Sequence, residues 1–328
     1  MSSCETISGV NLFQAWFDNR VVDDYDPLGQ QSLSPYLTIW MKWLRFLLNR
    51  HNTDNLNEET VRWERAEPTD VLAFLNGPIY SSKPGRRVSD VTRRRYWRLL
   101  ERVYDFAVEK QWIDHNPAAN IQENEKPPQE DHKGAILPDL LWRAVITRDK
   151  TVRDSVDIRD NAVLHLLFSC GLAPNEIRSL QLRDVLAASN GLPVALYIKG
   201  PGVRQDRKVF LPENVACILK KWIELRRSSC SWRNLTALFL SRENAPLSTK
   251  TLYVLVQREI KEVADDLGIS YPVRMGPQVI RNTVIVHWLN SGVPINIVVQ
   301  KVGLKDIKGI YRLREHLKPD VRRLLNKS

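Results

Sequence analysis

Residues 276–311 read GPQVIRNTVIVHWLNSGVPINIVVQKVGLKDIKGIY, and this stretch decides the fold. Pro277 stands where a helix can begin, because its fixed backbone angle suits the first turn of a helix. Apolar residues then recur at helical spacing, and the Asn-Ser-Gly sequence at 290–292 ends the run. A second apolar run spans residues 295–302 and closes at Gly303. The stretch therefore predicts two amphipathic helices and a loop that ends in a tyrosine.

Two residues in this stretch can carry chemistry. Arg281 lies near the start of the first expected helix, where its cation and the helix N-terminus both favour an anion. Tyr311 ends the loop. The pattern resembles the C-terminal half of the tyrosine recombinase, or phage integrase, family. In that family the helix opens H-x-x-R-H, a G-H pair follows it, and a nucleophilic tyrosine comes shortly afterwards.

The spacing of the family motif is present here, but several of its reactive residues are replaced. Arg281 matches the family's second catalytic arginine, and Tyr311 falls where the nucleophile stands. Gln278 and Asn282 replace the two histidines around that arginine, and Leu304 replaces the histidine of the G-H pair. The interval from Leu304 to Tyr311 is also shorter than is typical of the family. The resemblance implies a recombinase scaffold with an incomplete set of reagents.

A second part of the resemblance lies upstream. Residues 171–177 read GLAPNEI, whereas the family has G-L-R-x-S/T-E-L, with its arginine on the scissile phosphate. Glu176 matches this corner, but Ala173 takes the place of the arginine. The sequence leaves open whether another arginine, such as Arg178 or Arg274, fills that role.

A β-hairpin is predicted downstream of this corner. Apolar residues alternate at 194–198, a basic turn follows, and the chain returns at 209–212. Lys199 stands where the family hairpin carries the lysine that protonates the leaving oxygen. Its structural alternative is a contact to the phosphate backbone without a catalytic role. The further cations of the turn are predicted to contact the DNA backbone: Arg204, Arg207 and Lys208.

The resemblance implies DNA strand cleavage without metal, ATP or another cofactor. A tyrosine attacks a phosphodiester, and this step needs cations for the non-bridging oxygens, a base for the phenol and an acid for the leaving oxygen. Tyr311, Arg281 and Lys199 are the candidates for nucleophile, cation and acid. The loss of one preorganised donor typically lowers the rate by about 10²–10³. We therefore expect weak or absent cleavage, although Tyr311 also has a structural alternative as a half-buried tyrosine.

A helix expected from Ser89 to about Lys110 has one apolar side and a cluster of arginines on the opposite side. Acidic residues lie outside this cluster, which favours a face for phosphates over a merely solvated face. Such contacts give affinity and register without choosing a sequence. The candidate DNA-binding residues are Arg94, Arg95, Arg98 and Arg102, with Lys83, Arg86 and Arg87 just upstream.

Composition divides the chain. Residues 122–135 are rich in Glu, Pro, Gln and Asp and read as an interdomain linker. We expect an N-terminal arm or short helix over 1–30, and a helical, SAM-like core-binding domain over 31–121. A tyrosine-recombinase catalytic-like domain would follow over 136–328. The fold class is therefore mainly α with a small β-hairpin or sheet.

The basic tail after Tyr311 shows apolar residues at helical intervals: Leu317, Val321 and Leu324. In the family such a tail docks on a neighbouring protomer. Packing on its own domain is an equally open interpretation.

Charge and composition restrict the function. The 328 residues carry a net charge of +10 with a pI near 9.5, which favours polyanions as partners. The four cysteines lie far apart, and neither they nor the histidines have metal-ligand spacing. The sequence shows no signal-peptide core, membrane-spanning run or nucleotide-binding loop. We expect a cytoplasmic, nucleoid-associated, bacterial protein with no small-molecule substrate.

The preferred interpretation is a DNA-binding protein of site-specific recombination or integration with weak or no cleavage of its own. It would act as a partner subunit of an active recombinase, or as an architectural or regulatory factor, with double-stranded DNA as its ligand. Self-association through the tail stays open. One alternative is an active integrase that uses Tyr311 in a rearranged site. Another is a helical protein-binding scaffold whose basic charge is incidental.

Overall fold

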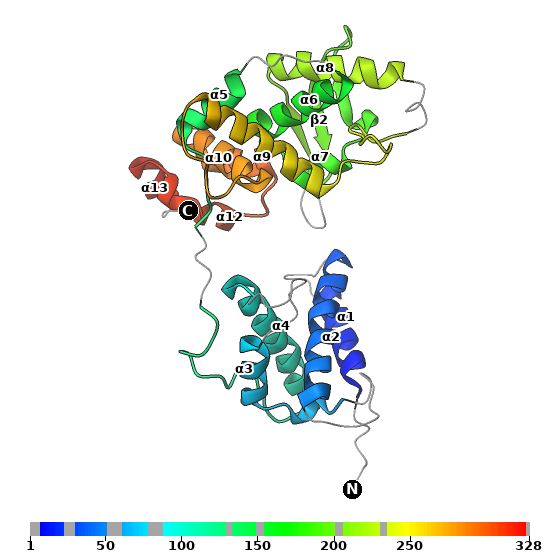
Figure 1. Cartoon of the computed structure of the whole chain (residues 1–328), viewed down its shortest axis with the longest axis vertical. Helices are drawn as coiled ribbons and strands as arrows, with labels where there is room; N and C mark the ends of the chain where they lie inside the picture. Colours follow the sequence, from blue (N-terminus) through cyan, green and yellow to red (C-terminus); the bar gives the residue numbers. More distant parts are fainter. Residues whose placement is uncertain are drawn as a thin grey trace. The chain divides into compact units, whose positions relative to one another are not determined.

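The computed structural model describes residues 7–22, 30–50, 61–77, 88–128, 133–148, 154–200, 206–229 and 235–325. The chain forms two compact units, residues 1–131 and 132–328, which are both drawn in Figure 1. Helices dominate both units, and the second also contains one small sheet. The predicted fold class, mainly α with a small β-sheet, is confirmed.

The first unit is a helical bundle around an aromatic core. Trp43 donates from its indole Nε1 to the hydroxyl of Tyr104 (3.0 Å), which donates in turn to the carbonyl of Trp63 (3.0 Å). Burial raises the pKa of the Tyr104 hydroxyl, so it stays a neutral donor. The helices of this unit are α1 (Gly9–Val22), α2 (Leu33–Arg50), α3 (Pro68–Asn76) and α4 (Asp90–Glu109), with short 3₁₀ turns η1 (Gln30–Ser32) and η2 (Trp63–Arg65).

Helix α1 belongs to this core. Residues 1–30 were assigned to an arm or a short helix from their polar and acidic character, but the described part includes a helix of 14 residues. Its large apolar side chains are buried: Leu12, Phe13, Trp16 and Phe17. Trp40 of α2 donates from Nε1 to the carbonyl of Gly9 (2.7 Å), which ties the start of α1 to the bundle. Three of these four buried α1 side chains are aromatic, and this clustering is the sequence signal for a core helix.

The second unit contains the three-stranded antiparallel sheet β1-β2-β3 and the remaining helices. Ala195 pairs with Phe210 and Ile198 pairs with Arg207, so the predicted hairpin is present. Helix α6 packs against both α8 and α10, and α8 packs on β2. The strands are β1 (Val185–Ala187), β2 (Pro193–Ile198) and β3 (Arg207–Phe210). The helices are α5 (Asp139–Thr147), α6 (Ser155–Cys170), α7 (Pro174–Ser179), α8 (Glu213–Ser228), α9 (Thr249–Asp266), α10 (Pro277–Asn290), α11 (Ile295–Val302), α12 (Lys308–Tyr311) and α13 (Pro319–Leu325), with 3₁₀ turns η3 (Leu182–Asp184) and η5 (Arg314–His316).

Both helices predicted from the opening stretch form where they were expected. Helix α10 begins at Pro277, and most of its side chains are buried because the second unit surrounds it. Helix α11 ends at Gly303, whose φ of +62° is the left-handed conformation that favours glycine. These two helices place Arg281 and the chain after Gly303 on one side of the core.

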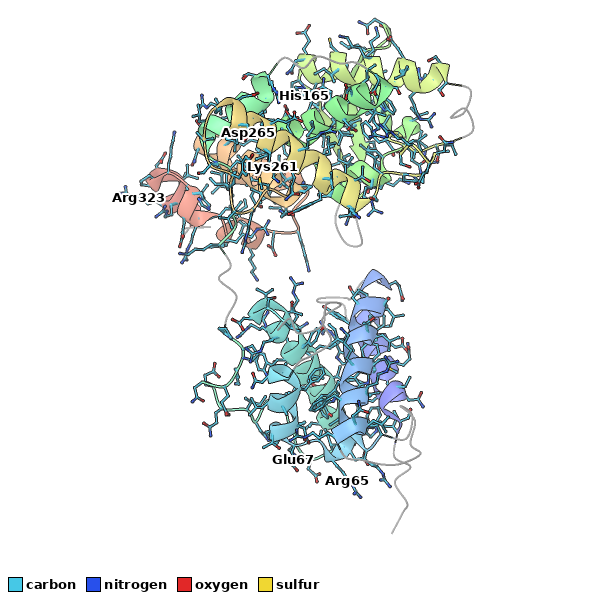
Figure 2. All side chains as sticks on the ribbon, viewed as in Figure 1. Arg65, Glu67, His165, Lys261, Asp265 and Arg323 are labelled. Atoms are coloured by element: carbon cyan, nitrogen blue, oxygen red, sulfur yellow. The ribbon has the colours of Figure 1, made fainter. Side chains whose placement is uncertain are left out.

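The tail packs on its own unit. Leu317, Val321 and Leu325 are buried in a cluster with side chains of α10 and α11. Three apolar positions were predicted to share one face of the tail helix, and this prediction is wrong for Leu324. Leu324 is 59% exposed, and Leu325 is buried in the core instead. The short α13 begins only at Pro319, so the helical phase differs from one counted through Leu317. Figure 2 shows the side chain of Arg323 on the outer side of this helix.

Candidate functional site

Glu176 is the centre of the candidate site. It lies in the first turn of α7, where its Oε2 accepts a hydrogen bond from the backbone N–H of Ala173 (2.8 Å). The same carboxylate forms ion pairs with two arginines: Arg281 Nη1 lies 3.5 Å from Oε2 and Arg207 Nη2 lies 2.9 Å from Oε1. All three side chains are more than nine-tenths buried. One carboxylate therefore gathers guanidinium groups from two distant parts of the chain.

Arg281 joins the α6–α7 corner to the end of α11. Its Nη1 donates to the carbonyl of Gly171 (2.6 Å), and its Nη2 donates to the carbonyl of Val302. Backbone carbonyls at a helix C-terminus carry partial negative charge, so they stabilise this buried cation. The guanidinium is thus held rigidly by the protein itself.

Arg207 lies beside Arg281, and this position differs from the one expected for a cation of the basic turn. Its Nε donates to the carbonyl of Lys301 (2.9 Å), the residue before the Val302 carbonyl that Arg281 uses. The absent side chain of Gly303 makes room for it: a Cβ there would lie 2.5 Å from Arg207 Nη1. The strand alternates, so Arg207 points inward with Val209 while Lys208 and Phe210 are exposed. That alternation was the available signal for its position.

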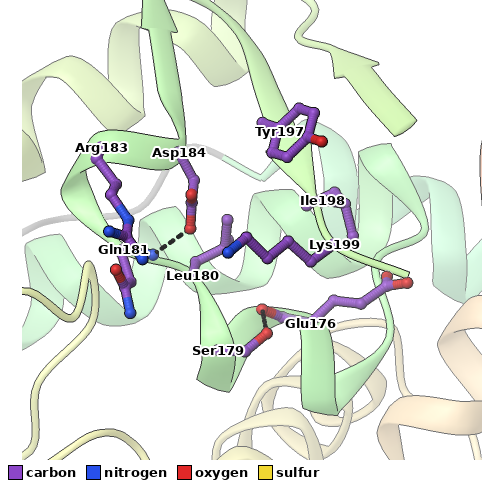
Figure 3. A pocket seen from close by; sticks show the side chains of 9 residues that line it. All are labelled: Glu176, Ser179, Leu180, Gln181, Arg183, Asp184, Tyr197, Ile198 and Lys199. Atoms are coloured by element: carbon purple, nitrogen blue, oxygen red, sulfur yellow. Dashed lines mark hydrogen bonds between the residues drawn. The ribbon is translucent and has the colours of Figure 1, made fainter. Parts of the chain in front are cut away.

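Lys199 lies at the end of β2, beside a small pocket of about 60 Å³ that Glu176 also lines. Figure 3 shows its side chain extending between Asp184 and Glu176, toward Leu180. Lys199 and Glu176 therefore line the same pocket, with the lysine amine directed toward Leu180.

Asp206 closes the loop end of the hairpin. Its Oδ2 accepts a hydrogen bond from the Tyr197 hydroxyl, and its Oδ1 accepts one from the backbone N–H of Gly200 (2.9 Å). These bonds lower the pKa of the Asp206 carboxyl, with the Tyr197 hydroxyl as the largest cause. The two strand ends that carry Lys199 and Arg207 are thereby joined across the hairpin.

Tyr311 lies at the end of α12 and is half-buried against the tail cluster. Its hydroxyl donates to the carbonyl of Leu325 in α13 (3.1 Å). Leu304 also packs at the edge of this cluster. In this structure the phenol is engaged by the protein's own tail.

The replacements at the two histidine positions form a polar connection beside Arg281. Asn282 Oδ1 accepts from Gln278 Nε2 (3.0 Å) and from Arg312 Nη2 (2.9 Å), while its Nδ2 donates to the carbonyl of Ala135 (3.0 Å). This network joins α10, the residue after Tyr311 and the segment that enters the second unit. Both side chains therefore have a structural role as well as a place in the motif. The two other candidate arginines lie elsewhere: Arg178 donates to the carbonyl of Leu247 (2.9 Å), and Arg274 is exposed.

The arginines of α4 form a separate group in the first unit. Arg95, Arg98 and Arg102 are exposed. Arg94 instead lies over the ring of Trp97, 5.3 Å from its centroid, and donates to the carbonyl of Pro127. It therefore holds the segment after Ile121 against α4. The predicted contacts Lys83, Arg86, Arg87 and Arg204 lie outside the described residues.

A cleft of about 1100 Å³ opens beside Arg207. Its described lining comes from β3, the end of α6, α10, α11 and the residues after Gly303. Four of these residues are cationic, Arg207, Lys208, Lys301 and Lys305, while Asp206 is the one acid among them. Leu304 also lines this cleft, so the motif position and Arg207 share one wall.

No group of three or more His, Cys, Asp or Glu side chains in the described ranges is arranged to hold a metal ion. None of the helices in those ranges is long and apolar enough to cross a membrane.

A model of the phage integrase family matches residues 143–315, which is more than half of the 328 residues. The chain belongs to the phage integrase family. This match spans Glu176, Arg281 and Tyr311, and it confirms the tyrosine recombinase resemblance seen in the motifs.

Relatives and solved structures agree with this assignment. The integrase-family chain is 24% identical to the tyrosine recombinase XerD of Oceanobacillus iheyensis over 284 residues, which cover 85% of this chain and 86% of the relative. It is 26% identical to XerC of Chlamydia muridarum over 212 residues, which cover 65% and 62% of the two chains. The Tn1549 transposon integrase, solved with a circular intermediate DNA, has a TM-score of 0.68 at 14% identity and covers 98% of this chain and 99% of that one. XerH bound to a palindromic difH substrate has a TM-score of 0.64 at 16% identity, covering 97% and 84%. These two structures show that the fold is shared.

Proposed function

We propose that this chain binds double-stranded DNA in site-specific recombination or integration and has weak or no strand-cleavage activity of its own. It would act as a partner subunit of an active recombinase, or as an architectural or regulatory factor, on DNA in the cytoplasm. The observation that carries the proposal is which residues occupy the reactive positions of the family motif and what they contact. Ala173 supplies no charge and Leu304 no proton, and the Tyr311 hydroxyl is hydrogen-bonded to the tail. A phenol without a base beside it is a poor nucleophile at neutral pH.

DNA as the ligand is supported by charge and by the relatives. The exposed arginines of α4 lie on one helix face, and four cations line the cleft of the second unit. Phosphate contacts by such groups provide most of the non-specific affinity for DNA. The Tn1549 integrase and XerH structures contain DNA. We assign the first unit to the core-binding domain and the second to the catalytic-like domain.

The experiment starts from DNA that the full-length protein selects from a random-sequence library at low salt. The selected duplex is then nicked, so that a cleaved strand cannot be rejoined and any covalent protein–DNA adduct accumulates. We expect retention of the duplex and an adduct yield about 10² or more below that of an active relative assayed in parallel. Tyr311→Phe is the matched control: it should leave DNA retention unchanged, and any small adduct yield that depends on Tyr311 should disappear.

Two results would contradict the proposal. An adduct that forms at the relative's yield and disappears in Tyr311→Phe would show an active enzyme. Failure to retain any duplex at low salt would remove DNA binding and support a protein-binding scaffold instead.

One observation favours the second candidate, an active integrase with a rearranged site. Arg207 and Arg281 converge on Glu176, so two guanidinium groups lie together although the family position 173 is alanine. Under this alternative the tail must leave Tyr311 before cleavage. The adduct assay separates the two candidates directly, because only the second requires a Tyr311-dependent covalent product.

A further inference from the structure

The guanidinium of Arg207 is buried but incompletely hydrogen-bonded. Only 7% of its side chain is exposed. Its Nε donates to the Lys301 carbonyl, whereas Nη2 has no hydrogen-bond acceptor among the described residues, although Glu176 Oε1 lies 2.9 Å away. A guanidinium has five N–H donors, and leaving buried donors unused costs free energy. An anion that accepted these hydrogen bonds would lower that cost.

The local charge points the same way. The carboxylate of Glu176 is shared by Arg207 and Arg281. Two guanidinium groups that share one carboxylate carry a surplus positive charge, which the carbonyls of Lys301 and Val302 offset only as dipoles. Like charges held close together in a buried place destabilise each other. A second anion beside Arg207 would neutralise this surplus positive charge.

The surroundings of Arg207 select the kind of anion. Its side chain lines the cleft of about 1100 Å³, together with Lys208, Lys301 and Lys305. Lys301 lies over the ring of Trp288, 4.3 Å from its centroid, so its ammonium is also held at this wall. Several cations around a wide, open cleft suit a polyanion that brings many phosphates, more than a single small ion.

We infer that Arg207, held next to Arg281 by Glu176, binds one phosphodiester of a DNA strand in this cleft. It thereby provides the cation that Ala173 lacks. Arginine suits this role because its planar fork donates two parallel hydrogen bonds to phosphate oxygens. The inference rests on the proposed function and deepens it: the site keeps a two-arginine clamp for a phosphate even where cleavage is weak.

The test measures DNA affinity of the full chain as a function of salt for the wild type, Arg207→Gln, Arg207→Lys and Arg227→Gln. Arg227 is exposed on α8 and outside the residues that line the cleft, so it controls for the loss of one charge. For Arg207→Gln we expect about tenfold or more weaker binding. The slope of log affinity against log salt should fall by about one. Arg207→Lys keeps the charge and should keep the slope while losing part of the affinity.

A second measurement guards against misfolding of Arg207→Gln. Inorganic phosphate, compared with chloride at equal ionic strength, should raise the unfolding temperature of the wild type more than that of Arg207→Lys. If Arg207→Gln fails to fold, this comparison decides. An equal rise in both proteins, or no rise in either, overturns the inference, because phosphate would then not bind through the Arg207 guanidinium.

The outcomes are distinguishable from those of the proposed function. No DNA binding by the wild type at low salt overturns the proposed function itself. Wild-type binding with an Arg207→Gln affinity and slope equal to those of Arg227→Gln overturns only the role of Arg207. A specific loss in Arg207→Gln, with the expected phosphate effect, supports it.

Discussion

At the scale of single residues, Gly303 decides where a charged group can lie. It ends α11 in the left-handed conformation, and the guanidinium of Arg207 occupies the space above its Cα. A side chain at this position would push that guanidinium away from Glu176 and from the Lys301 carbonyl. Glycine is therefore needed at position 303 both for the left-handed backbone conformation and for the space that Arg207 occupies.

We predict that Gly303→Ala destabilises the protein more than Gly268→Ala. Both glycines have nearly the same positive φ, +62° and +63°, so both substitutions carry the same backbone strain of about 1 kcal/mol. At Gly268 nothing lies within 4 Å of the added Cβ, whereas at Gly303 it would meet Arg207 Nη1 at 2.5 Å. Urea unfolding of the two variants measures the difference. Adding Arg207→Gln to both backgrounds should reduce it, and an unchanged difference would contradict the crowding.

The candidate site could be predicted in part from the residues alone. Arg281 and Glu176 were identified by motif, and the structure brings them into contact. The convergence of Arg207 was missed, because motif comparison directs attention to the position that lost its arginine. Whether Arg207 faces inward depends on the register of β3 with β2. The sequence of the basic turn does not determine that register.

At the scale of elements, long amphipathic segments were the most predictable. Helices α10 and α11 form over the expected residues because their apolar periodicity, proline start and glycine end all agree. Strand β1 was not predicted, because its three residues are too few to show a period. The predicted helical spacing in the tail was wrong at Leu324 for a related reason. Leu317 lies before the helix begins, so its spacing to Leu324 carried no helical information.

We predict effects of different size for two adjacent leucines of α13. Leu325 is fully buried against α10 and α11, so Leu325→Ala should cost about 2–3 kcal/mol of unfolding free energy. Leu324 is 59% exposed, and Leu324→Ala should stay within about 0.5 kcal/mol. Chemical unfolding measures both, and digestion of the tail by a carboxypeptidase should be faster only in Leu325→Ala. Equal costs would mean that the tail does not pack on its own unit.

We predict that the exposed arginines on one face of α4 contribute to DNA binding. Replacing Arg95, Arg98 and Arg102 by alanine should weaken DNA binding regardless of sequence and reduce the salt slope by about 2–3. The control replaces two exposed cations of the same unit, Arg65 and Lys110, and should change the slope less. A gel-shift titration in increasing salt measures both. A triple variant that binds like the control would remove this helix face from the interface.

At the scale of the whole molecule, the chain contains separate hydrophobic cores. The buried cluster of the first unit draws only on residues up to Ile121, and those of the second unit begin at Leu137. The described residues of the segment 122–135 pack on one or the other unit: Lys126 lies over Trp97 in the first, and Gly134 donates to the Arg312 carbonyl in the second (2.8 Å). Composition predicted the polar segment, but the contacts that it makes with each unit could not be predicted from composition.

We predict two unfolding transitions for the full chain. Each unit buries its own core, so each should unfold cooperatively when the other is already unfolded. Differential scanning calorimetry of the full chain, compared with residues 1–131 and 132–328 produced separately, tests this. Each transition of the full chain should match one fragment within a few degrees. A single transition that neither fragment reproduces would show that the cores depend on each other.

The arrangement around Glu176 also limits which residues position 173 can hold. Position 173 is alanine, and its backbone N–H already binds the carboxylate that Arg207 and Arg281 share. Ala173→Arg would add a third guanidinium close to one carboxylate, where mutual repulsion penalises it. We therefore expect arginine at 173 to be less destabilising when Arg207 is replaced by glutamine.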